Sequence, residues 1–154
     1  MEMILLCGLP GCGKSTYYKE HFFNTHLRIS NDLLKTKNRS ARLFDFCFET
    51  KMSFVVDNTN TTKEVRGKLI LACEEAAVQQ NEPIEKICYY FDCDSKVCLE
   101  RNEKRTGKDR VPKQAIFLKA KEFEAPKLDE GFDELNIVDA NGNIISTEYR
   151  SVEK

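Results

Sequence analysis

Nine residues near the start of the sequence have the types and the spacing of a phosphate-binding loop. They run Gly8-Leu9-Pro10-Gly11-Cys12-Gly13-Lys14-Ser15-Thr16 and fit the pattern G-x-x-x-x-G-K-[ST]. The glycines let the backbone curl until successive N–H groups point at phosphate oxygens. Lys14 can reach the β- and γ-phosphates of ATP, and the Ser15 hydroxyl can coordinate Mg²⁺. The pattern predicts an ATP site formed by Gly8, Pro10, Gly11, Cys12, Gly13, Lys14, Ser15 and Thr16.

A carboxylate near such a loop could take a proton from an attacking hydroxyl. Asp32 directly follows an expected strand over 27–30, and ligands of parallel sheets collect at the carboxyl ends of the strands. We therefore expect Asp32 to act as the general base in phosphate transfer. The same residue could instead cap a helix over 33–37, and it could do both.

A second carboxylate, Asp57, ends the hydrophobic segment Phe54-Val55-Val56. This is the Walker B arrangement, in which the aspartate binds the magnesium ion or orients its water shell. We therefore expect Ser15 and Asp57 to be the metal-binding residues. The alternative is an aspartate that only forms a turn at the end of the strand.

Three arginines surround the short loop 106–109. Arg101 and Arg105 are four residues apart, so one face of an expected helix over 95–105 would present both guanidinium groups. Together with Arg110 they could form a mobile lid that closes over ATP and stabilises charge in the transition state. The alternative is that they solvate an exposed helix end.

The residues between these sites alternate between strand and helix patterns. We expect strands over 3–7, 27–30, 53–57, 84–91 and 135–138, with a hairpin partner over 143–149 after the turn Asn141-Gly142. We expect helices over 15–23, 40–51, 61–80, 95–105 and 112–123, with Thr61 and Glu64 as a capping box. This alternation predicts an α/β fold, a parallel sheet flanked by helices on both faces, as a single domain over 1–154.

Composition excludes several classes of protein. The net charge of −1 carries no global signature of nucleic-acid binding, although residues 28–42 and 101–121 are locally basic and 122–134 are acidic. No apolar run approaches the length of a membrane span, so we expect no membrane association. Seven cysteines without a C-x-x-C pair indicate reduced thiols and an intracellular, reducing compartment, cytoplasm or nucleus. Cys12 stands beside Lys14 and a helix start, which would lower its pKa and make ATP binding sensitive to oxidation. The alternative is that Cys12 occupies a variable position of the loop and has no redox role.

Taken together, these residues resemble the P-loop kinase domain of the polynucleotide 5′-hydroxyl kinases. The resemblance rests on Gly8 to Thr16, Asn31-Asp32, Val56-Asp57-Asn58-Thr59-Asn60, residues 101–105 and Val111-Pro112. Near the end, Phe123-Glu124-Ala125-Pro126 and Glu130-Gly131-Phe132 resemble the tail of the kinase half of animal polynucleotide kinase-phosphatases.

The resemblance implies a role for each matching residue. Asp32 would activate the 5′-hydroxyl of DNA or RNA, Lys14 and Ser15 would hold phosphates and metal, and Arg101 and Arg105 would lie in the lid. Substrate-binding positions would be Lys35, Asp57, Asn58, Thr59 and Arg66, and either Asp57 or Asn58 could take the acceptor-side role. Phage-type members carry arginine where this chain has Lys35, which cannot grip a phosphate in two places. A role in nucleic-acid repair would require a separate phosphatase and a separate ligase.

Two other functions are compatible with the same residues. A kinase of a small metabolite hydroxyl (sugar, nucleoside or antibiotic) would use Asp32 in a closed acceptor pocket. A nucleotide-binding switch without phosphate transfer would not need Asp32, but the guanine-reading Asn-Lys-x-Asp element of such switches does not occur in the sequence.

Overall fold

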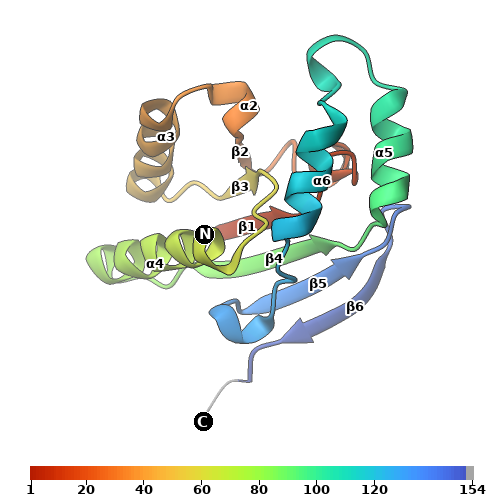
Figure 1. Cartoon of the computed structure of the whole chain (residues 1–154). Helices are drawn as coiled ribbons and strands as arrows, with labels where there is room; N and C mark the ends of the chain where they lie inside the picture. Colours follow the sequence, from red (N-terminus) through yellow and green to blue (C-terminus); the bar gives the residue numbers. More distant parts are fainter. Residues whose placement is uncertain (152–154) are drawn as a thin grey trace.

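A computed structural model describes residues 1–151, which form one twisted sheet with helices on both faces (Figure 1). Within these residues the sheet has six strands in the order β2-β3-β1-β4-β5-β6. The first five are parallel, and β6 pairs antiparallel with β5. Their bounds are β1 Glu2–Cys7, β2 Leu27–Ile29, β3 Phe54–Asp57, β4 Glu85–Phe91, β5 Glu134–Val138 and β6 Ile144–Tyr149. The predicted α/β fold and the predicted hairpin at the end are confirmed.

The central strand β1 is buried on both faces, which explains its uninterrupted apolar sequence. Met3 and Leu5 contribute to the hydrophobic core on one face of the sheet, and Ile4 and Leu6 to the core on the other. This burial holds the end of β1, and with it the start of the phosphate-binding loop, in a fixed place.

Helices cover the two faces unequally. Their bounds are α1 Lys14–His21, α2 Asn31–Leu34, α3 Lys37–Thr50, α4 Lys63–Gln80, α5 Ser95–Glu103 and α6 Lys113–Glu122, with short 3₁₀ turns η1 Gly107–Asp109 and η2 Leu128–Glu130. Helices α3 and α4 pack on the face of Met3 and Leu5, whereas α1, α5 and α6 pack on the face of Ile4 and Leu6. In the part of the chain that the structure describes, no helix is both long enough and apolar enough to cross a membrane.

Helix α3 begins at Lys37, three residues before its predicted start, and α4 has a different cap from the predicted one. The N-cap of α4 is Thr62, whose side chain accepts a hydrogen bond from the backbone N–H of Val65. The Thr61 hydroxyl instead donates a hydrogen bond to Glu122 at the end of α6, at 2.7 Å. The predicted capping box of Thr61 and Glu64 is therefore wrong, and Thr61 instead links α4 to α6.

Candidate active site

The phosphate-binding loop connects β1 to α1, as its sequence predicts. Gly11 and Gly13 have φ angles of 85° and 101°, a left-handed conformation that favours glycine. A Cβ atom at Gly11 would also lie 2.9 Å from the carbonyl oxygen of Cys98. Gly13 caps α1 without a side-chain hydrogen bond, so the first amides of the helix keep their capacity to bind an anion.

The ammonium group of Lys14 lies across this loop. It donates to the carbonyl oxygens of Gly8 and Leu9, each at 2.9 Å, and lies 3.4 Å from the sulfur of Cys12. These bonds hold a positive charge within the curve of the backbone, which would otherwise be lined by carbonyl oxygens. The arrangement suits a phosphate chain, whose charge could draw the ammonium group away from the two carbonyls.

The expectation of a reactive Cys12 is wrong. Only 2% of the residue is exposed, and this burial raises the pKa of its thiol, although Lys14 works in the opposite direction. The cost of removing a thiolate from water exceeds the attraction of one neighbouring ammonium group. Cys12 therefore packs as an apolar residue beneath the loop.

Asp57 connects the end of β3 to the loop. Its carboxylate is buried and accepts a hydrogen bond from the Ser15 hydroxyl at 2.9 Å. Arg28, which the sequence reasoning missed as a site residue, donates from Nε to the same carboxylate oxygen at 2.8 Å and from Nη2 to the Ser15 hydroxyl at 3.2 Å. A hydroxyl and a carboxylate are the oxygen donors that Mg²⁺ prefers, so these two side chains fit the ion.

A magnesium ion at this place would need ligands beyond the protein. Within residues 1–151, no group of three or more His, Cys, Asp or Glu side chains is arranged to hold a metal. Mg²⁺ commonly keeps several waters and binds through one or two protein oxygens plus substrate phosphates. The pair of Ser15 and Asp57 is therefore enough for an ion that arrives with a nucleotide.

Asp32 lies in the first turn of the short helix α2, and its side chain is exposed. The alternative prediction, that it caps a helix over 33–37, is wrong: Ser30 is the cap and accepts a hydrogen bond from the N–H of Leu33. Lys35 ends this helix with a φ angle of 71° and is also exposed. The carboxylate of Asp32 thus remains available to solvent and to a substrate.

Asn58 connects α2 to the end of β3. Its side-chain oxygen accepts a hydrogen bond at 2.8 Å from the N–H of Asn31, the neighbour of Asp32. The side chains of Asp57 and Asn58 therefore have different contacts, since Asp57 contacts the loop and Asn58 contacts the helix of the proposed base. Thr59 is half-buried, and its carbonyl oxygen accepts from the N–H of Gly8 at 3.0 Å.

Arg66 does not lie where a substrate could reach it. The residue is completely buried, and its Nε donates to Glu130 at 2.9 Å while its Nη1 donates to the carbonyl oxygen of Asn60 at 2.9 Å. Burial alone would lower the pKa of Arg66, but the hydrogen bonds and charge of Glu130 outweigh it and raise the pKa. The prediction of Arg66 as a substrate-binding residue is corrected: it is a structural cation beneath the loop 57–60.

The two arginines of the expected lid lie around one cavity but not on one helix. Helix α5 ends at Glu103, so Arg105 lies beyond it and donates to the carbonyl oxygen of Asp109 at 3.4 Å. Arg101 donates to the carbonyl oxygens of Gly11, at 3.4 Å, and of Ala140. In Figure 1, α5 and α6 run side by side, and the segment connecting them lies far from the sheet.

This cavity has a volume of about 390 Å³, in the range of small-ligand sites. Its walls come from the loop, the first helix, the arginine segment and the turn of the last hairpin, and include Gly11, Gly13, Thr16, Arg101, Arg105 and Gly142. It adjoins the phosphate-binding loop through Gly11, Cys12 and Gly13.

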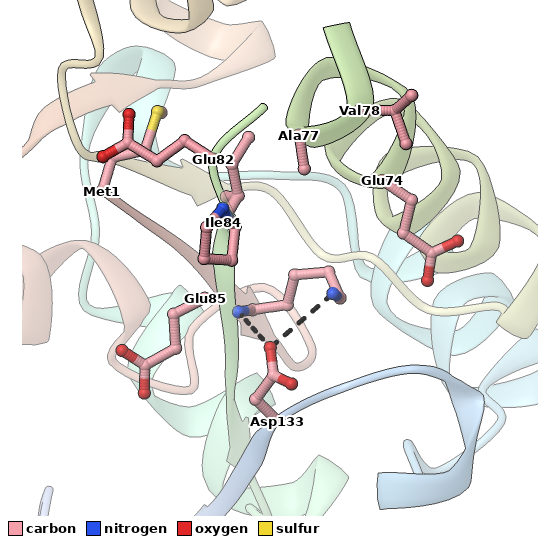
Figure 2. A pocket seen from close by; sticks show the side chains of 10 residues that line it. Met1, Glu74, Ala77, Val78, Glu82, Ile84, Glu85 and Asp133 are labelled. Atoms are coloured by element: carbon pink, nitrogen blue, oxygen red, sulfur yellow. Dashed lines mark hydrogen bonds and ion pairs between the residues drawn. The ribbon is translucent and has the colours of Figure 1, made fainter. Parts of the chain in front are cut away.

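A second cavity, of about 670 Å³, lies at the opposite end of the sheet (Figure 2). Met1 and Glu85 mark the amino ends of β1 and β4, and ligands of parallel sheets bind at the carboxyl ends. Its lining also includes Glu74, Glu82 and Asp133, with Asp133 paired to Lys86. This acidic surface would repel phosphates, so it is not the nucleotide site.

Comparisons with known proteins agree with this geometry. A family model described as "AAA domain" matches residues 28–126, which begin after the phosphate-binding loop. A bifunctional polynucleotide phosphatase/kinase of Schizosaccharomyces pombe is 27% identical over 135 residues, which are 85% of this chain and 32% of that protein. A putative bifunctional polynucleotide phosphatase/kinase of Acanthamoeba polyphaga mimivirus is 37% identical over 60 residues, 38% of this chain and 14% of that protein. The chain therefore spans about a third of the length of the first relative and less of the second.

A solved structure shows the same fold at low identity. The sugar kinase from Janibacter sp. HTCC2649 superposes with a TM-score of 0.66 at 14% identity, covering 93% of this chain and 87% of that one. The fold is thus that of P-loop kinases, and the sequence similarity confirms the resemblance to polynucleotide kinases. Because the family match covers more than half of the chain, the protein belongs to the P-loop family of the AAA domain.

Proposed function

We propose that this protein transfers the γ-phosphate of ATP, with Mg²⁺, to the 5′-hydroxyl of DNA or RNA. The observation that carries the proposal is the exposure of Asp32, which follows β2 at the same edge of the sheet as Ser15 and Asp57. A kinase of small metabolites would enclose its acceptor, whereas Asp32, Leu33 and Lys35 are all exposed. An open acceptor side supports a large substrate, and so do the names of the two relatives.

The chain's own residues divide the reaction between two sides. On the donor side, Lys14 and the first amides of α1 would bind the phosphates, and Arg101 and Arg105 would hold the nucleotide against the loop. Ser15 and Asp57 would hold Mg²⁺, which when bound neutralises charge on the phosphate oxygens.

On the acceptor side, Asp32 would take the proton as the O–H bond of the substrate breaks. The hydroxyl oxygen then bonds to the γ-phosphorus, and the bond between the γ-phosphorus and its bridging oxygen breaks to release ADP. Asn58 would keep the helix of Asp32 in place through its bond to Asn31.

The nucleic-acid strand would run along α2 and the start of α3. The basic residues there, Lys35, Lys37, Arg39 and Arg42, are all exposed. They suit contact with phosphates of the backbone, which fixes position without reading sequence. In a repair role the reaction would be used together with phosphatase and ligase activities, because a 5′-phosphate made at a strand break is useful only when the other end is also prepared and joined.

A phosphate-acceptor screen tests the proposal. ATP labelled in the γ-phosphate is incubated with the protein, Mg²⁺ and, in turn, 5′-hydroxyl DNA, 5′-hydroxyl RNA, nucleosides and sugars. We expect label on the oligonucleotides and none on the same oligonucleotides that already carry a 5′-phosphate. Transfer only to nucleosides or sugars would replace the proposal by a metabolite kinase, and transfer to no acceptor would refute it.

A further inference from the structure

One cation that belongs to the protein itself lies in the proposed metal site. Arg28 donates from Nε to Oδ2 of Asp57 at 2.8 Å and from Nη2 to the Ser15 hydroxyl at 3.2 Å. The Ser15 hydroxyl in turn donates to the same Oδ2 atom at 2.9 Å. The three side chains thus form a closed triangle around one carboxylate oxygen.

The register of the sheet explains this contact. Arg28 pairs with Val55 across β2 and β3. Asp57 lies two residues after Val55, so the side chains of Arg28, Val55 and Asp57 are on the same face of the sheet. Helix α1 covers this face. Ser15 is in the first turn of α1 on that face. The register of β2 against β3 therefore brings the guanidinium group to the pair of Ser15 and Asp57.

Charge explains why the contact is stable. The side chain of Asp57 is 2% exposed, so a carboxylate at this position needs a compensating positive charge. In the residues that the structure describes, Arg28 is its one ion-pair partner. The guanidinium carbon of Arg28 also lies 5.9 Å from the centre of the Tyr18 ring, a cation–π contact that it makes in addition to the ion pair.

A divalent cation would require the oxygen atoms that Arg28 now contacts. The Ser15 hydroxyl and the Asp57 carboxylate are the two groups assigned to Mg²⁺ in the proposed function, on which this step rests. Arg28 contacts only Oδ2 of this carboxylate, and a cation bound to Oδ2 and to the Ser15 hydroxyl would lie directly against the guanidinium group. Repulsion between the two cations would therefore favour departure of Arg28 from both bonds when the ion binds at these atoms.

We propose that Arg28 is a positioning residue that holds Ser15 and Asp57 in their ligand geometry until Mg²⁺ replaces it. Without Mg²⁺, the arginine holds Ser15 and Asp57 together and compensates the negative charge of Asp57. It also weakens the binding of Mg²⁺, because the ion must displace the arginine. Arg28 thereby sets how strongly nucleotide binding depends on Mg²⁺.

The test compares ATP dissociation constants with EDTA and with Mg²⁺, measured by calorimetry on the whole chain. In Arg28→Gln the ratio of the constant without Mg²⁺ to that with Mg²⁺ should rise about tenfold, the order of one lost charge-assisted hydrogen bond. Arg28→Lys keeps a cation and should stay near the wild-type ratio. Arg150→Gln, which removes an exposed arginine paired with Asp133, is the matched control and should leave the ratio unchanged.

The outcomes separate this inference from the proposed function. If Arg28 had only a structural role, Arg28→Gln would weaken ATP binding equally in both conditions, and an unchanged ratio would overturn the inference alone. If the wild-type protein binds no ATP in either condition, both the inference and the proposed function fail. A risen ratio combined with no phosphate transfer to any acceptor would support the exchange of Arg28 and refute the kinase reaction.

Discussion

The donor side and the acceptor side of the site are built differently. The donor side consists of the loop 8–16, whose backbone is tied to β3 and α5, and whose central residues Cys12 and Lys14 are buried. The acceptor side is the four-residue helix α2, which exposes Asp32 and is joined to the sheet through Asn58. If the proposed function holds, the buried loop is the part that a kinase of any acceptor needs, whereas the exposed helix α2 is the part that would select the acceptor.

The largest expected effect is on the acceptor side. Asp32→Asn removes the proposed base while keeping its size, so the rate of phosphate transfer should fall about 10³-fold. The dissociation constant of ATP should stay unchanged, because the exposed Asp32 makes no contact with the loop. Single-turnover transfer and calorimetry measure the two quantities, with the exposed Asp129→Asn as the control. Full transfer by Asp32→Asn would show that the division into two sides is wrong.

A substitution on the donor side should change both the binding of ATP and the rate of phosphate transfer. Lys14→Met removes the ammonium group that spans the loop, so kcat/KM for ATP should fall about 10²-fold and the ATP dissociation constant should rise. Steady-state kinetics and calorimetry check this result. Lys68→Met, which removes an exposed lysine paired with Glu64, should behave as wild type. Unchanged ATP binding in Lys14→Met would show that the loop 8–16 does not bind the phosphates of ATP as proposed.

A smaller effect on kcat is expected at Asn58, which connects α2 to the end of β3. Asn58→Ala deletes the oxygen that holds the N–H of Asn31, so kcat should fall about tenfold through misplacement of Asp32, with ATP binding unchanged. Asn58→Asp keeps an acceptor oxygen and should recover most of the rate. Equal loss in both variants would mean that Asn58 contacts the substrate rather than the helix.

The smallest effect is expected at Cys12. Its pKa is raised above the ordinary 9.0, so the reactive thiolate is a minor form at pH 7.5, and its fraction rises only as the pH approaches that higher value. Cys12→Ser and wild type should lose ATP binding to peroxide at rates that differ by less than about twofold. If Cys12→Ser kept its ATP binding in peroxide while wild type lost it, oxidation of Cys12 would control ATP binding after all.

The local parts of the site could be predicted from sequence, and the parts that depend on tertiary contacts could not. Gly11, Gly13 and Lys14 form the loop through contacts between residues that are close in the sequence, so their spacing is enough to identify it. Arg28 reaches Asp57 only through the pairing of β2 with β3, and its own neighbours in the sequence carry no sign of this.

Wrong predictions have the same physical origin. The family resemblance assigns Arg66 to the substrate, but Arg66 is buried and paired with Glu130, which is 64 residues away in the sequence. Thr61 fits the capping-box pattern with Glu64, yet the cap is Thr62, while Thr61 bonds to Glu122, which is 61 residues away. Arg105 lies outside the helix predicted over 95–105, because α5 ends at Glu103 and the connection to α6 begins there.

The hairpin of β5 and β6 has a consequence for the synthesis of the protein. Its turn supplies Ala140, which accepts a hydrogen bond from Arg101, and Gly142, which lines the same cavity as Gly11. A growing chain on the ribosome has made the whole loop long before this turn emerges. A nascent chain thus contains the complete loop 8–16 while one wall of the cavity lined by Gly11 and Gly142 has not yet been made.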